Sequence, residues 1–301
     1  MKKFKEILLL KNLKRVGNVA INRKYSKILK DANDLDDLIL KIKEMETKFN
    51  DEDLQNAKIA AEQTFENVIN TNVEVITVFD DNYPDKLNIM GKNKPPVLYV
   101  KGNIESLELP NIAIIGTRNP SQLSQEFEEN LVKQIANSTD NVVVSGLALG
   151  CDKIAHKTTV DENKITIAVL PSFVDEITPA SNKDLAEEIL QKGGCLISEY
   201  EPGKKVYKSN FTNRDKIVAA FSDSTVVIEC GVKSGTMHTV KAADKLKKQI
   251  YVYLPSEKPE DSFDGNEFIL NEYANSIKLE NIEDLNNNAK KEEGSLQTTL
   301  L

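Results

Sequence analysis

Four segments of the sequence combine small residues with charged or aromatic ones in a way that could bind a phosphorylated ligand. They lie at 116–121 (GTRNPS), 145–152 (SGLALGCD), 198–216 and 231–236 (GVKSGT). Glycine and serine let a ligand approach the backbone closely, and the Arg118 guanidinium adds a charge that helix ends alone do not supply. Phe211 lies close to Arg214 and Lys216, and an aromatic ring beside cations is typical of sites that stack a base and hold its phosphate. These residue types predict a nucleotide or nucleic-acid site.

Each of these features also has a structural interpretation. Gly116 could serve a tight strand-to-helix turn, and Asp152 could cap a helix. Arg118 could pair with an internal carboxylate such as Glu199 and hold its loop in place. The residue types alone leave both interpretations open.

The segments that must position these residues alternate between strand and helix. Short apolar runs predict strands at 111–116, 141–145, 164–170, 195–198, 224–230 and 249–254. The stretches between them are long enough for helices at 121–137, 151–160, 182–192, 213–222 and 236–247. Strands that are apolar on both faces and alternate with helices predict a Rossmann-like α/β fold, a parallel sheet with helices on both faces. Ligands bind outside the carboxyl ends of such strands, where all four segments fall.

The rest of the chain divides into three parts. Apolar residues at helical spacing predict a small N-terminal helical domain over 1–68, of helix-hairpin-helix or SAM-like type. β-rich runs at 75–79 and 97–100 predict extra strands beside the main sheet, so we expect one extended Rossmann-like domain over 69–285. Residues 286–301 have no periodicity and predict a disordered tail.

Composition excludes several classes of protein. The formal net charge is −8, yet residues 1–30 contain ten Lys or Arg and one acid, so the overall charge does not decide the partner. No run of about eighteen apolar residues exists, so we expect no membrane-spanning helix and no membrane partner. The three cysteines form no CxxC pair, and we expect His156 and His238 to be structural. The sequence therefore predicts no metal, no cofactor and a cytoplasmic location.

In their order along the chain, these segments resemble the motifs of the DNA-processing protein A family, DprA/Smf. The corresponding segments are GTRNPS (116–121), SGLALGCDKIAH (145–156), SEY (198–200), NFTNRDKIVAAFS (210–222) and SGTMHTVKAA (234–243). In the family they read GSRxxS, SGLAxGIDxxAH, SEY, FPxRNRIIAGLS and SGxxxTAxxA. The resemblance covers roughly residues 82–255, beginning at NYPDKL and PPVLYVKG.

The resemblance implies a non-catalytic homodimer that binds single-stranded DNA without marked sequence preference. It also implies that the protein protects this strand and assists the loading of a RecA-type recombinase in DNA uptake, transformation and recombination. The residues expected to contact the strand are Gly116, Thr117, Arg118, Ser121, Ser145, Gly146, Lys208, Asn210, Phe211, Arg214, Lys216, Ser234, Gly235, Thr236 and Lys241.

The sequence departs from the family pattern inside the basic block. Thr212 stands where the family has proline, and Asp215 and Lys216 stand where it has asparagine and arginine. Because the Asp215 carboxylate is a negative charge in a cationic segment, we expect weaker DNA binding than in a typical member. We also expect no winged-helix segment, which many members carry, and this leaves a mobile-element role open beside transformation.

Two alternatives remain open at this level. A phosphoribohydrolase family on the same Rossmann variant carries PGGxGTxxE, and alignment on the SGT residues puts its glutamate at Thr239. Because Thr239 offers no carboxylate, a nucleotide-processing enzyme is the weaker alternative. It stays open because Glu199 and Glu229 are acidic candidates at strand ends. A nucleotide-sensing effector domain would keep the phosphate loops without the basic track at 204–216.

Overall fold

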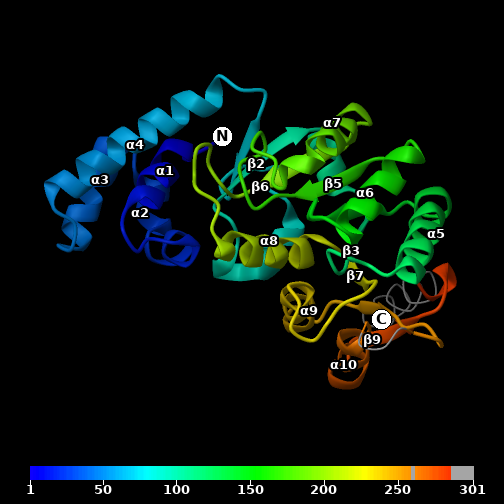
Figure 1. Cartoon of the computed structure of the whole chain (residues 1–301). Coiled ribbons are helices and arrows are strands. Elements are labelled where there is room, and N and C mark those ends of the chain that lie inside the picture. Colours follow the sequence, from blue (N-terminus) through cyan, green and yellow to red (C-terminus); the bar gives the residue numbers. More distant parts are fainter. Residues whose placement is uncertain (259–261, 286–301) are drawn as a thin grey trace, which may run out of the picture.

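The computed structural model describes residues 1–258 and 262–285, and within them a sheet forms the centre of the molecule (Figure 1). Its strands are β1 (Glu74–Thr77), β2 (Val97–Gly102), β3 (Asn111–Ile115), β4 (Val142–Ser145), β5 (Thr166–Val169), β6 (Cys195–Ser198), β7 (Ser224–Val227), β8 (Ile250–Tyr253) and β9 (Ser276–Leu279). They form one nine-stranded sheet in the order β1-β2-β6-β5-β4-β3-β7-β8-β9. Pairing is parallel from β6 to β9, whereas β1 with β2 and β2 with β6 are antiparallel.

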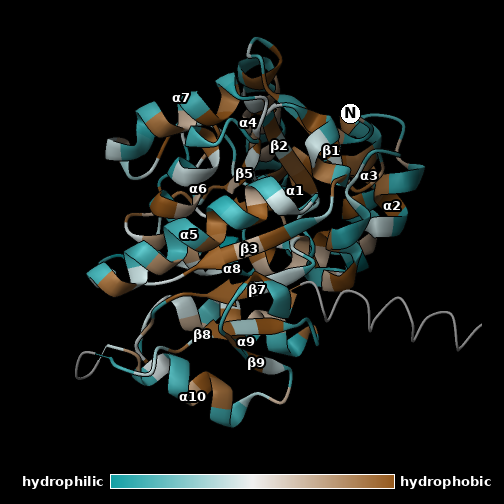
Figure 2. Cartoon of the chain, turned by 90° about the vertical axis from the view of Figure 1, so that its right-hand side faces the viewer, coloured by the Kyte–Doolittle hydropathy of each residue, from teal (hydrophilic) through white to brown (hydrophobic). Residues whose placement is uncertain are grey.

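Helices cover both faces of this sheet. The crossover helices are α5 (Gln122–Ser138), α6 (Cys151–Asp161), α7 (Lys183–Gln191), α8 (Lys208–Phe221), α9 (Thr236–Lys245) and α10 (Asp264–Glu272). Ile112 and Ile114 of β3 share a core with α5 and α6, while Ala113 and Ile115 share a core with α8 and α9. Successive residues of a strand point to opposite faces, so a strand buried on both sides must be apolar throughout. Figure 2 shows these apolar strands between helices whose outer surfaces are hydrophilic. The predicted Rossmann-like α/β fold is confirmed.

Four further α-helices precede the sheet in the chain. They are α1 (Phe4–Asn12), α2 (Ser26–Asp31), α3 (Leu35–Met45) and α4 (Asp51–Ile69), with a π-helical turn at Ala20–Lys24. They pack on the β2 end of the sheet, where the Phe4 and Tyr99 ring centroids are 6.0 Å apart and those of Tyr99 and Phe173 are 5.5 Å apart. The N-terminal helices and this part of the sheet therefore share one hydrophobic core.

Two elements differ from the sequence prediction. α8 begins at Lys208, whereas the sequence predicted a helix from residue 213, so Phe211 lies in its first turn. Threonine at 212 keeps the backbone N–H that proline would lack, which allows the helix to pass through this position. β9 was not predicted, because of its four residues at the sheet edge only Leu279 is buried, so the strand carries a weak apolar signal.

Other expectations from the sequence concern the thiols, the membrane and the tail. Cys151, Cys195 and Cys230 are free and buried, and burial raises the pKa of the Cys195 and Cys230 thiols to about 12. Across residues 1–258 and 262–285, none of the helices has the length and apolar character needed to cross a membrane. The predicted disordered tail at 286–301 lies outside the described residues.

Candidate nucleic-acid interface

Arg118 and Phe211 lie against each other beside the carboxyl ends of the strands. Arg118 follows β3, in a loop that ends where Ser121 caps α5. Its guanidinium carbon lies 5.6 Å from the centroid of the Phe211 ring, which is a cation–π contact. The Arg118 side chain is exposed, and no carboxylate in the described part of the chain forms an ion pair with it. The structural interpretation that pairs Arg118 with Glu199 is not seen, because Glu199 instead accepts a hydrogen bond from Asn18 Nδ2 at 2.8 Å.

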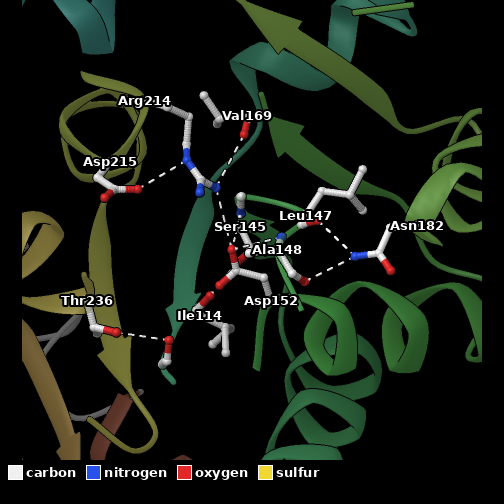
Figure 3. A network of polar contacts seen from close by, with 12 residues as sticks. Ile114, Ser145, Leu147, Ala148, Asp152, Val169, Asn182, Arg214, Asp215 and Thr236 are labelled. Carbon is white, nitrogen blue, oxygen red and sulfur yellow. Dashed lines mark hydrogen bonds and ion pairs between the residues drawn. The ribbon is translucent and has the colours of Figure 1, made fainter. Parts of the chain in front are cut away.

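Arg214 has a different environment and lies inside the molecule (Figure 3). Its side chain is 6% exposed, its Nη1 atom lies 3.5 Å from Asp152 Oδ2, and its Nε atom lies 3.1 Å from Asp215 Oδ1. Nη1 also lies 3.5 Å from the carbonyl oxygen of Val169. A Cβ at Gly146 would overlap this guanidinium group, so a glycine is needed for its close approach. Arg214 thus neutralises buried carboxylates and is not presented to solvent.

Several other predicted site residues use their polar groups to hold the loops. Ser145 Oγ donates to Ile114 O at 2.6 Å, and Thr236 Oγ1 donates to Gly116 O at 2.9 Å. Ser121 donates to Glu229 Oε2 from its backbone N–H at 2.9 Å and from its hydroxyl at 2.7 Å.

Three further predicted residues are held in the same way. Asn210 Nδ2 donates to Pro171 O at 3.0 Å, and the Gly146 N–H donates to Asp152 Oδ2 at 3.1 Å. Thr117 joins the same set through its backbone N–H, which donates to Glu229 O at 2.7 Å. These hydrogen bonds hold the candidate phosphate-binding loops in shape. The residues that form them therefore support the site, and neighbouring residues form the outer surface of the loops.

The remaining predicted residues lie at the surface or close to it. Lys208, Lys216 and Gly235 are exposed, as is Lys241, and Ser234 is half-buried. Lys208 and Lys216 belong to α8 and Lys241 to α9, two helices that pack side by side. The structure therefore separates the predicted residues into an exposed set and an internal set that supports it.

A groove of about 1250 Å³ opens next to this exposed set. One wall comes from the end of α1 and the turn after it, and the other from α8 and α9, with Glu199, Tyr200 and Glu201 after β6 between them. Its cationic side chains are Lys11, Arg15, Arg23, Lys24, Lys204, Lys205, Lys216, Lys241 and Lys245. Of the residues predicted from the sequence, Asn210, Lys216 and Lys241 line it, whereas Arg118 and Phe211 lie outside its lining.

The sequence prediction missed several lining residues of the right type, among them Tyr207 and Lys245. Tyr207, whose side chain is exposed, stands inside the basic stretch at 204–216, which was the available signal for it. Lys245 follows Lys241 at the i,i+4 spacing that places two side chains on one helix face.

Two titratable groups near the interface have strongly displaced pKa values. Burial raises the pKa of Asp215 to about 6, against the lowering effect of the Arg214 charge. Burial lowers the pKa of His156 to about 4, and its Nδ1 atom lies 2.8 Å from Thr166 Oγ1. His156 is therefore an internal, hydrogen-bonded histidine, which agrees with its structural interpretation.

The family model described as DNA recombination-mediator protein A matches residues 74–290, well over half of the chain. The chain belongs to the DNA recombination-mediator protein A family. The predicted resemblance to DprA/Smf is confirmed, and the family match includes the loop that carries Arg118 and the helix that carries Phe211 and Arg214.

Relatives within this family align over much of the same region. Protein Smf of Borreliella burgdorferi is 32% identical over 187 residues, which cover 61% of this chain and 58% of that protein. DNA processing protein DprA of Streptococcus pneumoniae is 29% identical over 201 residues, which cover 67% of this chain and 70% of that protein. Against protein Smf of Synechocystis the match covers 46% of the relative, so the chain spans about half the length of the two Smf proteins.

Solved structures of the family share the architecture. DNA processing protein A of Streptococcus pneumoniae superposes with a TM-score of 0.75 at 25% identity, covering 91% of this chain and 94% of that one. DNA processing protein A of Helicobacter pylori gives a TM-score of 0.64 at 29% identity, covering 74% of this chain and 98% of that one. The second structure addresses the single-stranded DNA binding mode of the Helicobacter pylori protein.

The two carboxylates considered for a phosphoribohydrolase, those of Glu199 and Glu229, are buried and accept hydrogen bonds within the protein. Glu199 and Glu229 are each 6% exposed, and Glu229 is the acceptor for Ser121 described above. Thr239, which stands at the position of the hydrolase glutamate, is buried. Within residues 1–258 and 262–285, no three His, Cys, Asp or Glu side chains group so that they could hold a metal ion.

Proposed function

We propose that this chain is a non-catalytic protein that binds single-stranded DNA through the exposed surface around Arg118 and Phe211. The observation that carries the proposal is the stacked pair itself: an exposed guanidinium group against an aromatic ring at the sheet edge where ligands bind. An unpaired base stacks on such a ring while the cation holds its phosphate. Lys208, Lys216, Lys241, Ser234, Gly235 and the backbone of Gly116 and Thr117 would complete the contact surface.

The internal residues have a supporting part in this proposal. Ser121, Ser145, Gly146, Asn210, Arg214 and Thr236 keep the loops in the shape that presents Arg118 and Phe211. Following the family resemblance, the bound strand would be protected and passed to a RecA-type recombinase by a cytoplasmic homodimer acting in DNA uptake and recombination. The single-stranded DNA binding mode addressed for the Helicobacter pylori protein supports the first step of this scheme.

An electrophoretic shift with matched single- and double-stranded oligonucleotides tests the proposal. Single strands are expected to bind more tightly, because a base in a duplex is not free to stack on Phe211. Phe211→Ala should weaken single-strand binding by about 1–3 kcal/mol, the range for loss of one stacked base. Equal affinity of the parent protein for both forms of DNA would contradict the proposal.

A further inference from the structure

We propose that the groove between the N-terminal helices and helices α8 and α9 carries the continuation of the single strand held at Arg118, with Tyr207 as a second stacking residue. This inference rests on the proposed function. It assigns a ligand, a single-stranded polynucleotide, to a surface that begins where the Arg118–Phe211 pair ends.

The groove and the stacked pair are adjacent on α8. Asn210 and Thr212 both line the groove, and Phe211 between them contacts Arg118. A strand whose base meets Phe211 therefore needs to pass only the first turn of this helix to reach the groove. Lys216 extends the same lining by one further turn.

The charge of the groove is positive because, among the described residues, nine cationic side chains line it against two carboxylates, those of Glu199 and Glu201. Lys11 Nζ forms an ion pair with Glu201 at 2.6 Å and donates to the carbonyl oxygen of Glu199 at 2.9 Å. Asn18 binds the Glu199 carboxylate, as described above. Arg15, Arg23, Lys216, Lys241 and Lys245 are exposed and form no ion pair with a carboxylate of the described residues. These unneutralised cations on both walls suit a chain of phosphates.

The exposed aromatic side chain of Tyr207 in the groove favours a nucleic acid over an acidic protein segment. Tyr207 is 60% exposed, and Lys205 Nζ lies 5.8 Å from the centroid of its ring. This repeats at a second place the combination found at the half-buried Phe211, an aromatic ring beside a cation. Val19 and Ile89 add exposed apolar surface at 40% and 49%, against which further bases can lie.

Oligothymidylates of two lengths, about 6 and about 20 nucleotides, separate the groove from the stacked pair; for comparison, one OB-fold covers about 4–16 nucleotides of single-stranded DNA. The short probe should occupy the Phe211 region and the long one should also fill the groove. Tyr207→Ala should weaken binding of the long probe at least about fivefold and leave the short probe unchanged, while Tyr207→Phe should bind both as the parent does. The double variant Arg15→Gln/Arg23→Gln should lower the salt dependence of long-probe binding by about 1.4 logarithmic units.

The matched control is Lys14→Gln/Lys27→Gln, which removes the same charge from exposed positions of the same segment that do not line the groove. It should bind both probes as the parent does. If the groove variants bind the long probe like this control, the groove does not carry DNA, and the inference fails while the proposed function stands. The proposed function itself fails if the parent protein binds neither probe, or if Phe211→Ala leaves the affinity for the short probe unchanged. If the parent protein binds an acidic peptide and the groove variants still bind the long probe normally, the groove belongs to a protein partner.

Discussion

Gly146 and Arg214 are a matched pair, in which the guanidinium group fills the space that any side chain at position 146 would need. A Cβ at Gly146 would lie 0.9 Å from the Arg214 Nη1 atom. Asp152 contacts both partners, accepting a hydrogen bond from the Gly146 N–H and forming an ion pair with Arg214. The loop after β4 and the helix α8 are therefore fixed to each other through one buried charge.

Gly146→Ala should displace Arg214 and leave the buried Asp152 carboxylate without its cation. Breaking a buried ion pair costs about 3–5 kcal/mol, so we expect the free energy of unfolding to fall by about 3 kcal/mol in a denaturant titration. Gly235→Ala is the control, because a Cβ there meets no atom within 4 Å, and it should change stability by less than about 0.5 kcal/mol. Equal stability of the two variants would show that Arg214 can move without cost.

Arg118→Ala should weaken single-strand binding and lower its salt dependence by about 0.7 logarithmic units, the share of one phosphate contact. Stability should hardly change, because the side chain is exposed and forms no ion pair with a described carboxylate. Arg118→Lys should keep part of the affinity, since lysine retains the charge without the two-pronged donor geometry. Lys133→Ala, at an exposed position on α5, is the control for loss of one charge. A lower Tm with an unchanged salt slope would instead make Arg118 a structural residue.

Asp215 should make DNA binding depend on pH. Its pKa is raised to about 6 by burial, so the carboxyl group is neutral at pH 5 and charged at pH 8. Loss of this negative charge near Arg118 should tighten binding of an oligothymidylate at pH 5 by up to about 1 kcal/mol relative to pH 8. Asp215→Asn should bind at pH 8 as the parent does at pH 5, and fluorescence anisotropy at both pH values measures this. A parent protein with the same affinity at both pH values would refute the assignment.

His156 should make the fold sensitive to acid. Its folded pKa of about 4 lies below the ordinary value of 6.5, so the unfolded state binds more protons between these values. The contribution of His156 to stability should therefore fall by about 3 kcal/mol as the pH is lowered from 6.5 to 4. Urea titrations across this range should show stability falling by about 3 kcal/mol more in Asp215→Asn than in Asp215→Asn/His156→Gln. The Asp215→Asn background matters because the raised pKa of Asp215 acts in the opposite direction, lowering stability as the pH rises from about 4 to 6.

The sequence predicted the sheet well because buried parallel strands leave a plain signal. The runs around Ile112–Ile115, Val142–Val144 and Val226–Ile228 are apolar at every position, since each lies between two layers of helices. The edge strand β9 lacked this signal, because Ser276 and Lys278 face solvent at least in part. The start of α8 was predicted too late, because the lysines at 204–208 have the composition of a loop.

The sequence predicted which types of residue form the candidate site, but it did not predict which of their side chains are exposed. Arg118 and Arg214 both stand in family motifs, yet one is exposed and the other is enclosed by Asp152 and Asp215. Asp215 is visible in the sequence beside Arg214, but spacing along the chain does not reveal Asp152, which comes from the first turn of α6, far from α8 in sequence. The wall that Arg15 and Arg23 add to the groove was likewise hidden, since it depends on how α1 packs against β2.

The burial of all three thiols has a practical consequence for studying this molecule. Cys151, Cys195 and Cys230 are enclosed, and their raised pKa values keep them in the unreactive thiol form at neutral pH. A cysteine introduced at the exposed position Lys14 or Lys133 would therefore react selectively with a maleimide dye without removal of the native ones. Fluorophores at such positions would allow the path of a labelled oligonucleotide to be followed by energy transfer in an otherwise unaltered chain.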